Sequence, residues 1–231
     1  VVATNLGTVF KPAASAGRWL RQYVGEIYPQ WFGAINGNNS PYDTATVQAC
    51  LDFAALSDLR PVKFASTYYV TTITIESSFQ SIDFNSHKLI GVSTTPSTDA
   101  ILLIQSYSAI LRDVHVDCNF NTNYRAAVRW FGDATHTNPG GNDIFGMFIE
   151  NAITGLVIGA HPGDAPYNAP LSESSVYDLK YRGTERCLYI NQPNGKLNFY
   201  GPVLAVTKNE WDAANPGVFD FSTAYCLFND P

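Results

Sequence analysis

The chain has 231 residues, of which 45% are hydrophobic and 15% are charged, and its formal net charge is −6. This composition supports a substantial apolar core and excludes a disordered chain. An acidic chain without a Lys/Arg cluster is a poor match to the phosphate backbone of nucleic acid. No run of 18 apolar residues is present. We therefore expect no nucleic-acid partner and no membrane insertion.

Residues 1–30 mix Gly, Ala and Pro with one apolar cluster at residues 19–24, and we interpret them as a lead-in segment before one domain, 31–231. They lack a basic flank followed by an apolar stretch, so we expect no signal peptide. The cysteines lie far apart without CxxC spacing, which predicts buried free thiols instead of a zinc site or a disulfide framework. They are Cys50, Cys118, Cys187 and Cys226. No metal-binding motif is present, and we expect no metal and no cofactor.

The segment Trp31–Leu56 carries the most specific pattern, WFGAINGNNSPYDTATVQACLDFAAL. An aromatic-Phe-Gly-Ala start leads into a polar loop rich in Gly and Asn, and Asp43 then has the character of a helix N-cap. The apolar residues that follow lie on one face at helical spacing. They are Val47, Cys50, Leu51, Ala54 and Ala55.

This order resembles the N-terminal entry module of the pectate-lyase-like family, which includes tailspike and depolymerase proteins of bacteriophages. The resemblance covers roughly residues 27–91. It implies an all-β fold, a right-handed single-stranded parallel β-helix, in which the N-terminal helix caps the first coil. It also implies an activity on polysaccharides.

A seven-residue frame recurs along the chain at nearly constant steps of 32, 33 and 32 residues. The frame is apolar, any, small or Asp, apolar, any, apolar, polar. Its copies are FQSIDFN at 79–85, LRDVHVD at 111–117, IFGMFIE at 144–150 and VYDLKYR at 176–182. Stacked coils produce such a period, because each coil needs neighbours above and below to bury its apolar face. A β-sandwich also has short, regularly spaced strands, but it would not ordinarily repeat one frame at this step.

A second apolar strand follows each of the last three copies, and a later counterpart lies near the chain end. These strands are 127–130, 155–158, 187–190 and 226–228. The run VTTITIE at 70–76 is too close to the first copy to be a full coil, so we place it on a different face. The last strand has no evident polar cap, and we expect either that the native chain continues or that a partner subunit covers this end.

Within the frame, positions four and six face the core and positions five and seven face outward, because strand residues alternate. Superposed copies therefore predict that Ile82, Val114, Met147 and Leu179 stack. Position three, at a bend, carries Ser81, Asp113, Gly146 and Asp178, with Asp113 and Asp178 as corner residues. Position five carries Asp83, His115, Phe148 and Lys180. Position seven carries Asn85, Asp117, Glu150 and Arg182.

Asp117 and Glu150 are the predicted catalytic pair, because neighbouring coils would bring their carboxylates close together. Carboxylates about 5 Å apart suit retaining glycoside hydrolysis, and wider pairs suit inversion. A lyase would instead need a base such as His, Lys or Arg. The predicted substrate-binding residues are His115, Phe148, Lys180 and Arg182. The structural alternative is that polar ladders of this kind are solvated surface or satisfy backbone groups at corners.

The resemblance implies a phage tailspike or tail-fibre protein that binds and depolymerises a bacterial surface polysaccharide, by hydrolysis or by elimination. It implies a homotrimer in the virion tail, with other tail proteins as partners. Two alternatives stay open. One is a non-enzymatic virion structural or adhesin module on the same fold, and the other is a secreted, monomeric pectinase-like enzyme.

Overall fold

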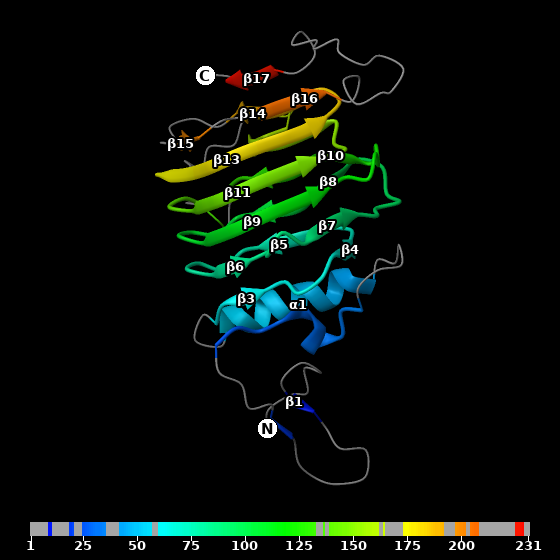
Figure 1. The fold of residues 1–231 in the computed structure, drawn as a ribbon, viewed down its shortest axis with the longest axis vertical. Coiled ribbons are helices and arrows are strands. Elements are labelled where there is room, and N and C mark those ends of the chain that lie inside the picture. The colour runs from blue at the N-terminus through cyan, green and yellow to red at the C-terminus, as the bar shows by residue number, and fades with distance from the viewer. Residues whose placement is uncertain are drawn as a thin grey trace.

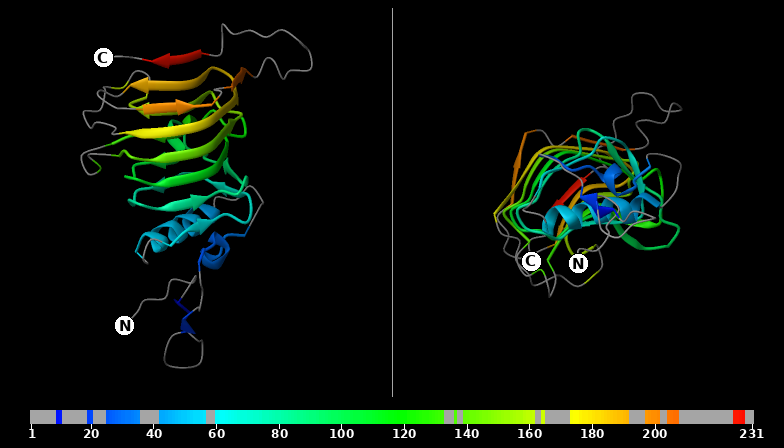
Figure 2. Two further views of the ribbon diagram at one scale, coloured as in Figure 1. Left: turned by 60° about the vertical axis from the view of Figure 1, so that its left-hand side comes forward. Right: turned by 90° about the horizontal axis from the view of Figure 1, so that it is seen from below.

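The computed structural model describes residues 9–10, 19–20, 25–35, 42–56, 60–132, 136, 139–161, 164, 173–191, 197–201, 204–207 and 225–228. In these ranges the chain winds into stacked coils whose strands form two parallel sheets (Figures 1 and 2). The predicted parallel β-solenoid with one N-terminal α-helix is confirmed, and the two face-to-face antiparallel sheets of a β-sandwich are excluded.

In the described ranges the larger sheet, sheet 1, has nine strands and the smaller, sheet 2, has six. Sheet 1 contains β3 (Val62–Lys63), β4 (Tyr68–Val70), β6 (Ser81–Asp83), β7 (Lys88–Gly91), β9 (Ile110–Asp117), β11 (Asp143–Glu150), β13 (Ser174–Gly183), β15 (Leu197–Tyr200) and β16 (Leu204–Thr207). Sheet 2 contains β5 (Ile73–Ile75), β8 (Thr98–Ile104), β10 (Tyr124–Trp130), β12 (Thr154–Gly159), β14 (Arg186–Asn191) and β17 (Tyr225–Phe228).

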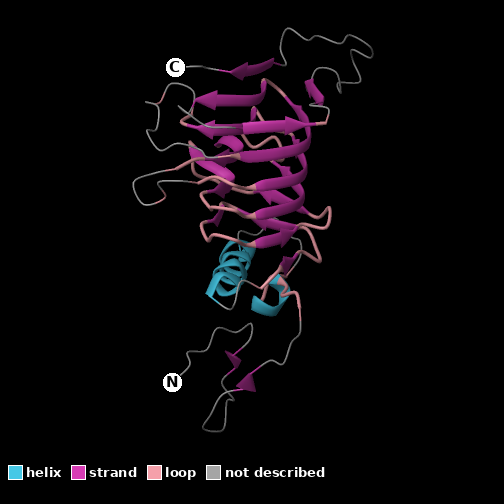
Figure 3. Ribbon diagram, turned by 90° about the vertical axis from the view of Figure 1, so that its left-hand side faces the viewer, coloured by secondary structure: helices cyan, strands magenta, loops and turns pink. Residues whose placement is uncertain are grey.

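The N-terminal part holds a two-stranded antiparallel pair, β1 (Val9–Phe10) and β2 (Trp19–Leu20), and a 3-10 helix, η1 (Pro29–Phe32). The helix α1 (Tyr42–Leu56) lies against the first coil at one end of the solenoid (Figure 3). Its buried side chains join the core, so it covers that end as predicted. They are Val47, Cys50, Leu51 and Ala54. No helix in the described ranges is long and apolar enough to cross a membrane.

Asp43 has a different role from the predicted N-cap. The helix begins one residue earlier, at Tyr42, so Asp43 lies in its first turn. One carboxylate oxygen accepts the backbone N–H of Ile35 at 2.9 Å, and the other accepts that of Tyr69 at 3.3 Å. Asp43 therefore connects the helix to the preceding loop and to β4, because its carboxylate accepts N–H groups from both.

The copies of the frame at 111–117, 144–150 and 176–182 superpose residue by residue in β9, β11 and β13. Val114 pairs with Met147, which pairs with Leu179, and all three side chains are buried. Ordinary strand alternation thus places these positions in the core. The prediction of stacked apolar residues is confirmed for these three coils.

The first copy of the frame, 79–85, is three positions out of the predicted register. Ile82 pairs with Leu111 and not with Val114. In β9 both position one, Leu111, and position four, Val114, carry a buried apolar residue, so Ile82 could pair with either by the pattern of apolar residues alone. The predicted places of Ser81, Asp83 and Asn85 in the outward rows are consequently wrong.

A turn at Asn85 and Ser86 causes this shift. Both residues have left-handed backbone angles, with φ of 50° and 59°, a conformation that Asn adopts more readily than most residues. The turn divides the coil into β6 and β7, and the chain returns to the sheet at Lys88, which pairs with His115. Lys88 therefore occupies the place in the row that Asp83 was predicted to fill.

Position three of the frame is a bend, as predicted. Asp113, Gly146 and Asp178 have φ of 51°, 74° and 55°, and Gly201 continues the row with φ of 78°. A left-handed residue turns the strand and leaves positions two and three both facing outward. The prediction that Asp113 and Asp178 form corners is confirmed.

The predicted second strands of the coils form sheet 2. Val128 on β10 pairs with Leu156 on β12, and Leu156 pairs with Leu188 on β14. The run at 70–76 contributes β5 to this sheet, a different face as predicted, and β17 pairs with β14.

Three cysteines are buried free thiols, as predicted, and the side chain of Cys226 lies outside the described residues. They are Cys50, Cys118 and Cys187.

Candidate functional site

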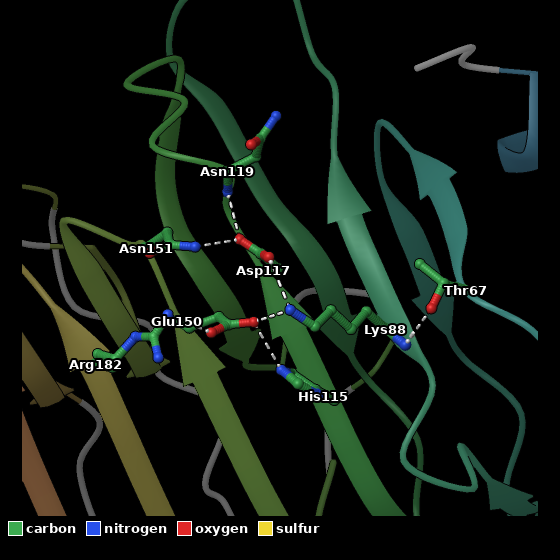
Figure 4. Close-up of polar contacts among 8 residues, drawn as sticks. All are labelled: Thr67, Lys88, His115, Asp117, Asn119, Glu150, Asn151 and Arg182. Carbon is green, nitrogen blue, oxygen red and sulfur yellow. Dashed lines mark hydrogen bonds and ion pairs between the residues drawn. The ribbon is translucent and has the colours of Figure 1, made fainter. Parts of the chain in front are cut away.

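The outer face of sheet 1 brings Asp117, Glu150 and Arg182 side by side on three successive strands. His115 is on the same strand as Asp117, two residues earlier, and Lys88 enters from β7 on the neighbouring coil. The adjacency predicted for the position-seven residues is therefore present. We call these five residues the Lys88 cluster (Figure 4).

Glu150 is at the centre of the Lys88 cluster. Its Oε1 contacts Lys88 Nζ and is 3.0 Å from His115 Nε2. Its Oε2 is 3.1 Å from Arg182 Nη2. Only 4% of the Glu150 side chain is exposed, so these three partners compensate a carboxylate that water hardly reaches.

The carboxylate of Asp117 also has a partner at each oxygen. Its Oδ2 is 3.3 Å from Lys88 Nζ. Its Oδ1 accepts the backbone N–H of Asn119 and the amide of Asn151, each at 2.8 Å. Because Asp117 and Glu150 contact one ammonium nitrogen, their carboxylates lie close together, as a retaining glycosidase would require. All four of their oxygens also have protein partners.

The pKa values of the cluster follow from these contacts. Burial raises the pKa of Asp117, but its hydrogen bonds from Asn151 and Asn119 and the charge of Lys88 outweigh burial and lower it. Burial lowers the pKa of Lys88, but contacts with Glu150 and Asp117 outweigh burial and raise it. Burial also lowers the pKa of His115, and here its contact with Glu150 does not reverse the shift. At neutral pH the Asp–Lys contact is therefore ionic and His115 is neutral.

A groove of about 390 Å³ lies beside the cluster on the same face of sheet 1. Its lining contains the residues at positions three and five of the stacked copies of the frame. At position three, Gly146 lies between the corner residues Asp113 and Asp178. The lining residues that matter below are Asp113, His115, Gly146, Phe148, Asp178 and Lys180. The groove therefore collects three predicted substrate-binding residues, His115, Phe148 and Lys180. Arg182 lies in the Lys88 cluster instead.

An aromatic column runs along position two of the frame on the same face. Phe145 stacks on Tyr177 with ring centroids 4.7 Å apart, and Tyr177 stacks on Tyr200 at 4.8 Å. The guanidinium of Arg112 covers Phe145 at 4.8 Å. The faces of Phe145 and Tyr177 are thus occupied by protein groups, so this column stabilises the coils and does not offer those rings to a sugar.

Two polar residues of the site were not anticipated from the sequence. Lys88 was missed because its position depends on the turn at Asn85 and Ser86, although the alternating run KLIG after a polar turn is a strand signal. Asn151 directly follows the third copy of the frame, outside the seven positions compared. In the described part of the chain, no group of three His, Cys, Asp or Glu side chains converges to hold a metal ion.

No family model and no curated protein matches the sequence. Among solved structures, the chain is similar to the enzymatically active domain of tailspike protein 2 from bacteriophage CBA120. The similarity has a TM-score of 0.29 and 15% identity, and it covers 96% of this chain and 48% of that one. The chain thus spans about half the length of that structure, and so weak a superposition carries no argument about activity.

Proposed function

We propose that this protein is a phage tailspike or tail-fibre component that binds a bacterial surface polysaccharide and depolymerises it. The observation that carries the proposal is the groove on sheet 1, which lies beside two close carboxylates and contains His115, Phe148 and Lys180. A concave polar site with an aromatic side chain and ionisable groups suits a chain of sugar rings. The entry segment at 31–56 supports the same class of protein.

The catalytic roles of Asp117 and Glu150 stay a prediction. If they act directly on the glycosidic bond, their close spacing favours retention of configuration. The Asp117→Asn variant should then lose about 10²-fold or more in cleavage rate. Incubation with purified capsular polysaccharides, followed by measurement of new reducing ends and unsaturated products, tests this. Asp83→Asn is the matched control, because Asp83 pairs with Lys63 outside the groove.

A non-enzymatic adhesin is the second candidate, favoured by one observation. Every oxygen of Asp117 and Glu150 is already held by a protein group, as expected of a structural ladder. An adhesin would bind the same polysaccharides and release no product. Undiminished cleavage by Asp117→Asn would remove this residue from the mechanism, whereas binding without any cleavage by the wild-type protein would favour the adhesin.

The proposed assembly is a homotrimer in the virion tail, with other tail proteins as neighbours. A secreted, monomeric pectinase-like enzyme is the competing assignment. Sedimentation equilibrium separates the two, since a trimer has a mass near three times the 25.3 kDa of the chain. A monomeric mass that persists at high protein concentration would contradict the tailspike assignment.

A further inference from the structure

The contact between Glu150 and His115 fixes where the imidazole carries its proton. Glu150 contacts the two cationic side chains of Lys88 and Arg182, and a carboxylate in that setting only accepts hydrogen bonds. His115 Nε2, 3.0 Å away, must therefore be the donor. In neutral imidazole the other nitrogen, Nδ1, then has a free lone pair and can act as a base.

His115 also faces the groove. No group in the described part of the chain forms a hydrogen bond with its Nδ1, and this atom is not among the buried unpaired ones. The ring of Phe148 lies against the imidazole with centroids 4.7 Å apart. Glu150 thus contacts one edge of the imidazole and Phe148 one side of it, and the other nitrogen, unpaired among the described residues, is not fully buried in a residue that lines the groove.

Lys180 adds a positive charge to the groove, and no carboxylate in the described ranges forms an ion pair with it. Of the three lysines in the described ranges, Lys63 and Lys88 contact carboxylates. Lys180 lines the groove two coils from His115, and no ion pair involves it within those ranges. A lysine without a partner carboxylate in a binding groove is suited to an anionic group of a ligand.

We propose that His115 is the catalytic base of the groove, that Glu150 is the positioning residue for His115, and that Lys180 binds an acidic group of the polysaccharide. This inference rests on the proposed function and specifies its substrate class as a uronate-containing polysaccharide and its reaction as an elimination. Glu150 then acts through His115 and does not contact the scissile bond.

The step balances without a co-reactant. His115 Nδ1 takes the hydrogen on the ring carbon that bears the carboxylate, and the electron pair of that C–H bond forms a C=C bond to the neighbouring carbon. The C–O bond to the next sugar breaks. The leaving oxygen receives the proton from the imidazolium that has formed. Lys180 stabilises the negative charge that develops on the carboxylate, and Glu150 stabilises the imidazolium.

The charges around His115 determine how the rate of the proposed elimination depends on pH. Glu150 on β11 and Asp117 on β9 raise its pKa, whereas burial, the largest cause, and Lys88 on β7 lower it. Lys180, Asp113 and Asp178 face the same groove. Because the net shift is downward from 6.5, the base is already unprotonated at neutral pH. The rate should rise with pH only below that value and then stay level through pH 8.

The first test is substrate-independent. Nitrogen-15 NMR of the histidine rings reports the protonated nitrogen and the pKa. We expect the Nε2–H form of His115, a pKa below 6.5, and a further decrease in Glu150→Gln, because Glu150 raises this pKa. A merely structural contact would leave the tautomer and the acidic limb of the rate profile unchanged in this variant. An Nδ1–H form in the wild-type protein would overturn the proposal.

The second test uses polygalacturonate, polyglucuronate and alginate as acidic probes and dextran as a neutral one. We expect retention of an acidic probe in affinity electrophoresis, at least 10-fold weaker in Lys180→Met and unchanged in the control Lys63→Met. His115→Gln should lower the formation of unsaturated product about 10²-fold. Wild-type protein that binds no acidic probe would overturn the assignment of Lys180.

The outcomes separate this inference from the proposed function. Cleavage of a neutral polysaccharide at a rate unchanged in Lys180→Met and His115→Gln would overturn the inference and leave a depolymerase. Binding of acidic probes without cleavage of any polysaccharide would overturn the base assignment and, with it, the depolymerase half of the proposed function. Unsaturated product from the wild-type protein that is lost in His115→Gln would support both.

Discussion

Lys88 reaches two carboxylates that belong to two successive strands, β9 and β11. The gain from such a pair is limited by the cost of removing charges from water. The loss on removing one partner is larger, because the remaining charge stays buried without compensation. Glu150 retains Arg182 and Asp117 retains two amide donors, so the loss here is partial.

We predict that Lys88→Met destabilises the protein by about 2 kcal/mol, less than the roughly 3–5 kcal/mol of a fully uncompensated buried charge. The methionine keeps most of the side-chain volume and removes only the ammonium. Urea unfolding followed by circular dichroism measures the change. Lys180→Met is the matched control and should stay within about 0.5 kcal/mol of wild type, because Lys180 is exposed. Equal stability of the two variants would contradict this account of the cluster.

The register of the strands was predictable where the coils repeat without interruption. Leu111, Ile144 and Val176 could be aligned because the same bend at position three follows each, and Asp and Gly tolerate that conformation. The coil with Ile82 could not be aligned, because an apolar residue fits position one or position four equally well. Only the backbone of the turn at Asn85–Ser86 decides the pairing.

The candidate site was predictable in part for the same reason. The adjacency of Asp117 and Glu150 followed from the repeat, whereas their burial did not. Burial depends on cations from other coils, and Lys88 lies on the one coil whose register the sequence left open. The groove, and the division of the outer face into a buried ion-pair cluster and an open polar row, depend on how side chains from several coils pack, which the repeat does not determine.

Asn142 connects three successive coils. Its side chain accepts the backbone N–H of Ala109 at 2.7 Å and the hydroxyl of Ser106 at 3.2 Å, and it donates to the carbonyl of Ser106 at 2.9 Å. Its own backbone N–H donates to the hydroxyl of Ser174 at 3.3 Å. The side chain is fully buried, so these bonds have no water to replace them.

Asn142→Ala should therefore cost about 1–3 kcal/mol, because it leaves a buried N–H and a buried carbonyl without partners. Urea unfolding measures this, and Asn198→Ala on the partly exposed strand β15 is the control. We expect the control to lie within about 0.5 kcal/mol of wild type. A loss below that value in Asn142→Ala would show that other groups satisfy Ala109 and Ser106.

Buried or half-buried ionic contacts occur on both sheets of the solenoid. The Lys88 cluster is on sheet 1. On sheet 2, His161 contacts Asp99 at 2.5 Å and Arg129 contacts the other oxygen of the same carboxylate. Burial raises the pKa of Asp99, but the contacts with His161 and Arg129 outweigh burial and lower it. Proton binding therefore opposes folding at two separate places in the solenoid.

The free energy of unfolding should accordingly be highest between about pH 7 and pH 10 and decrease on both sides. Asp117 and Asp99 have pKa values lowered from 3.8, so their contribution is present above 3.8 and is lost as the pH falls through their folded values. The pKa of His115 is lowered from 6.5 in the folded protein, so the unfolded chain binds this proton more tightly. The free energy of unfolding therefore decreases as the pH falls from 6.5 to the folded pKa of His115. Lys88 has a raised pKa, so its contribution is full below 10.5 and is lost above.

The midpoint of urea unfolding at a series of pH values from about 2 to about 11 measures this profile. His115→Gln isolates one part of it, because the variant lacks the imidazole whose pKa is lowered from 6.5 in the folded protein. We expect the variant to show a flat midpoint between about pH 7 and pH 5.5, where the wild-type midpoint decreases. A wild-type midpoint that is constant from pH 8 to pH 4 would contradict the lowered pKa of His115. A midpoint that stays constant from pH 4 down to about pH 2 would contradict the lowered pKa values of Asp117 and Asp99. If the two proteins share one decrease near pH 6, the cause is a histidine other than His115.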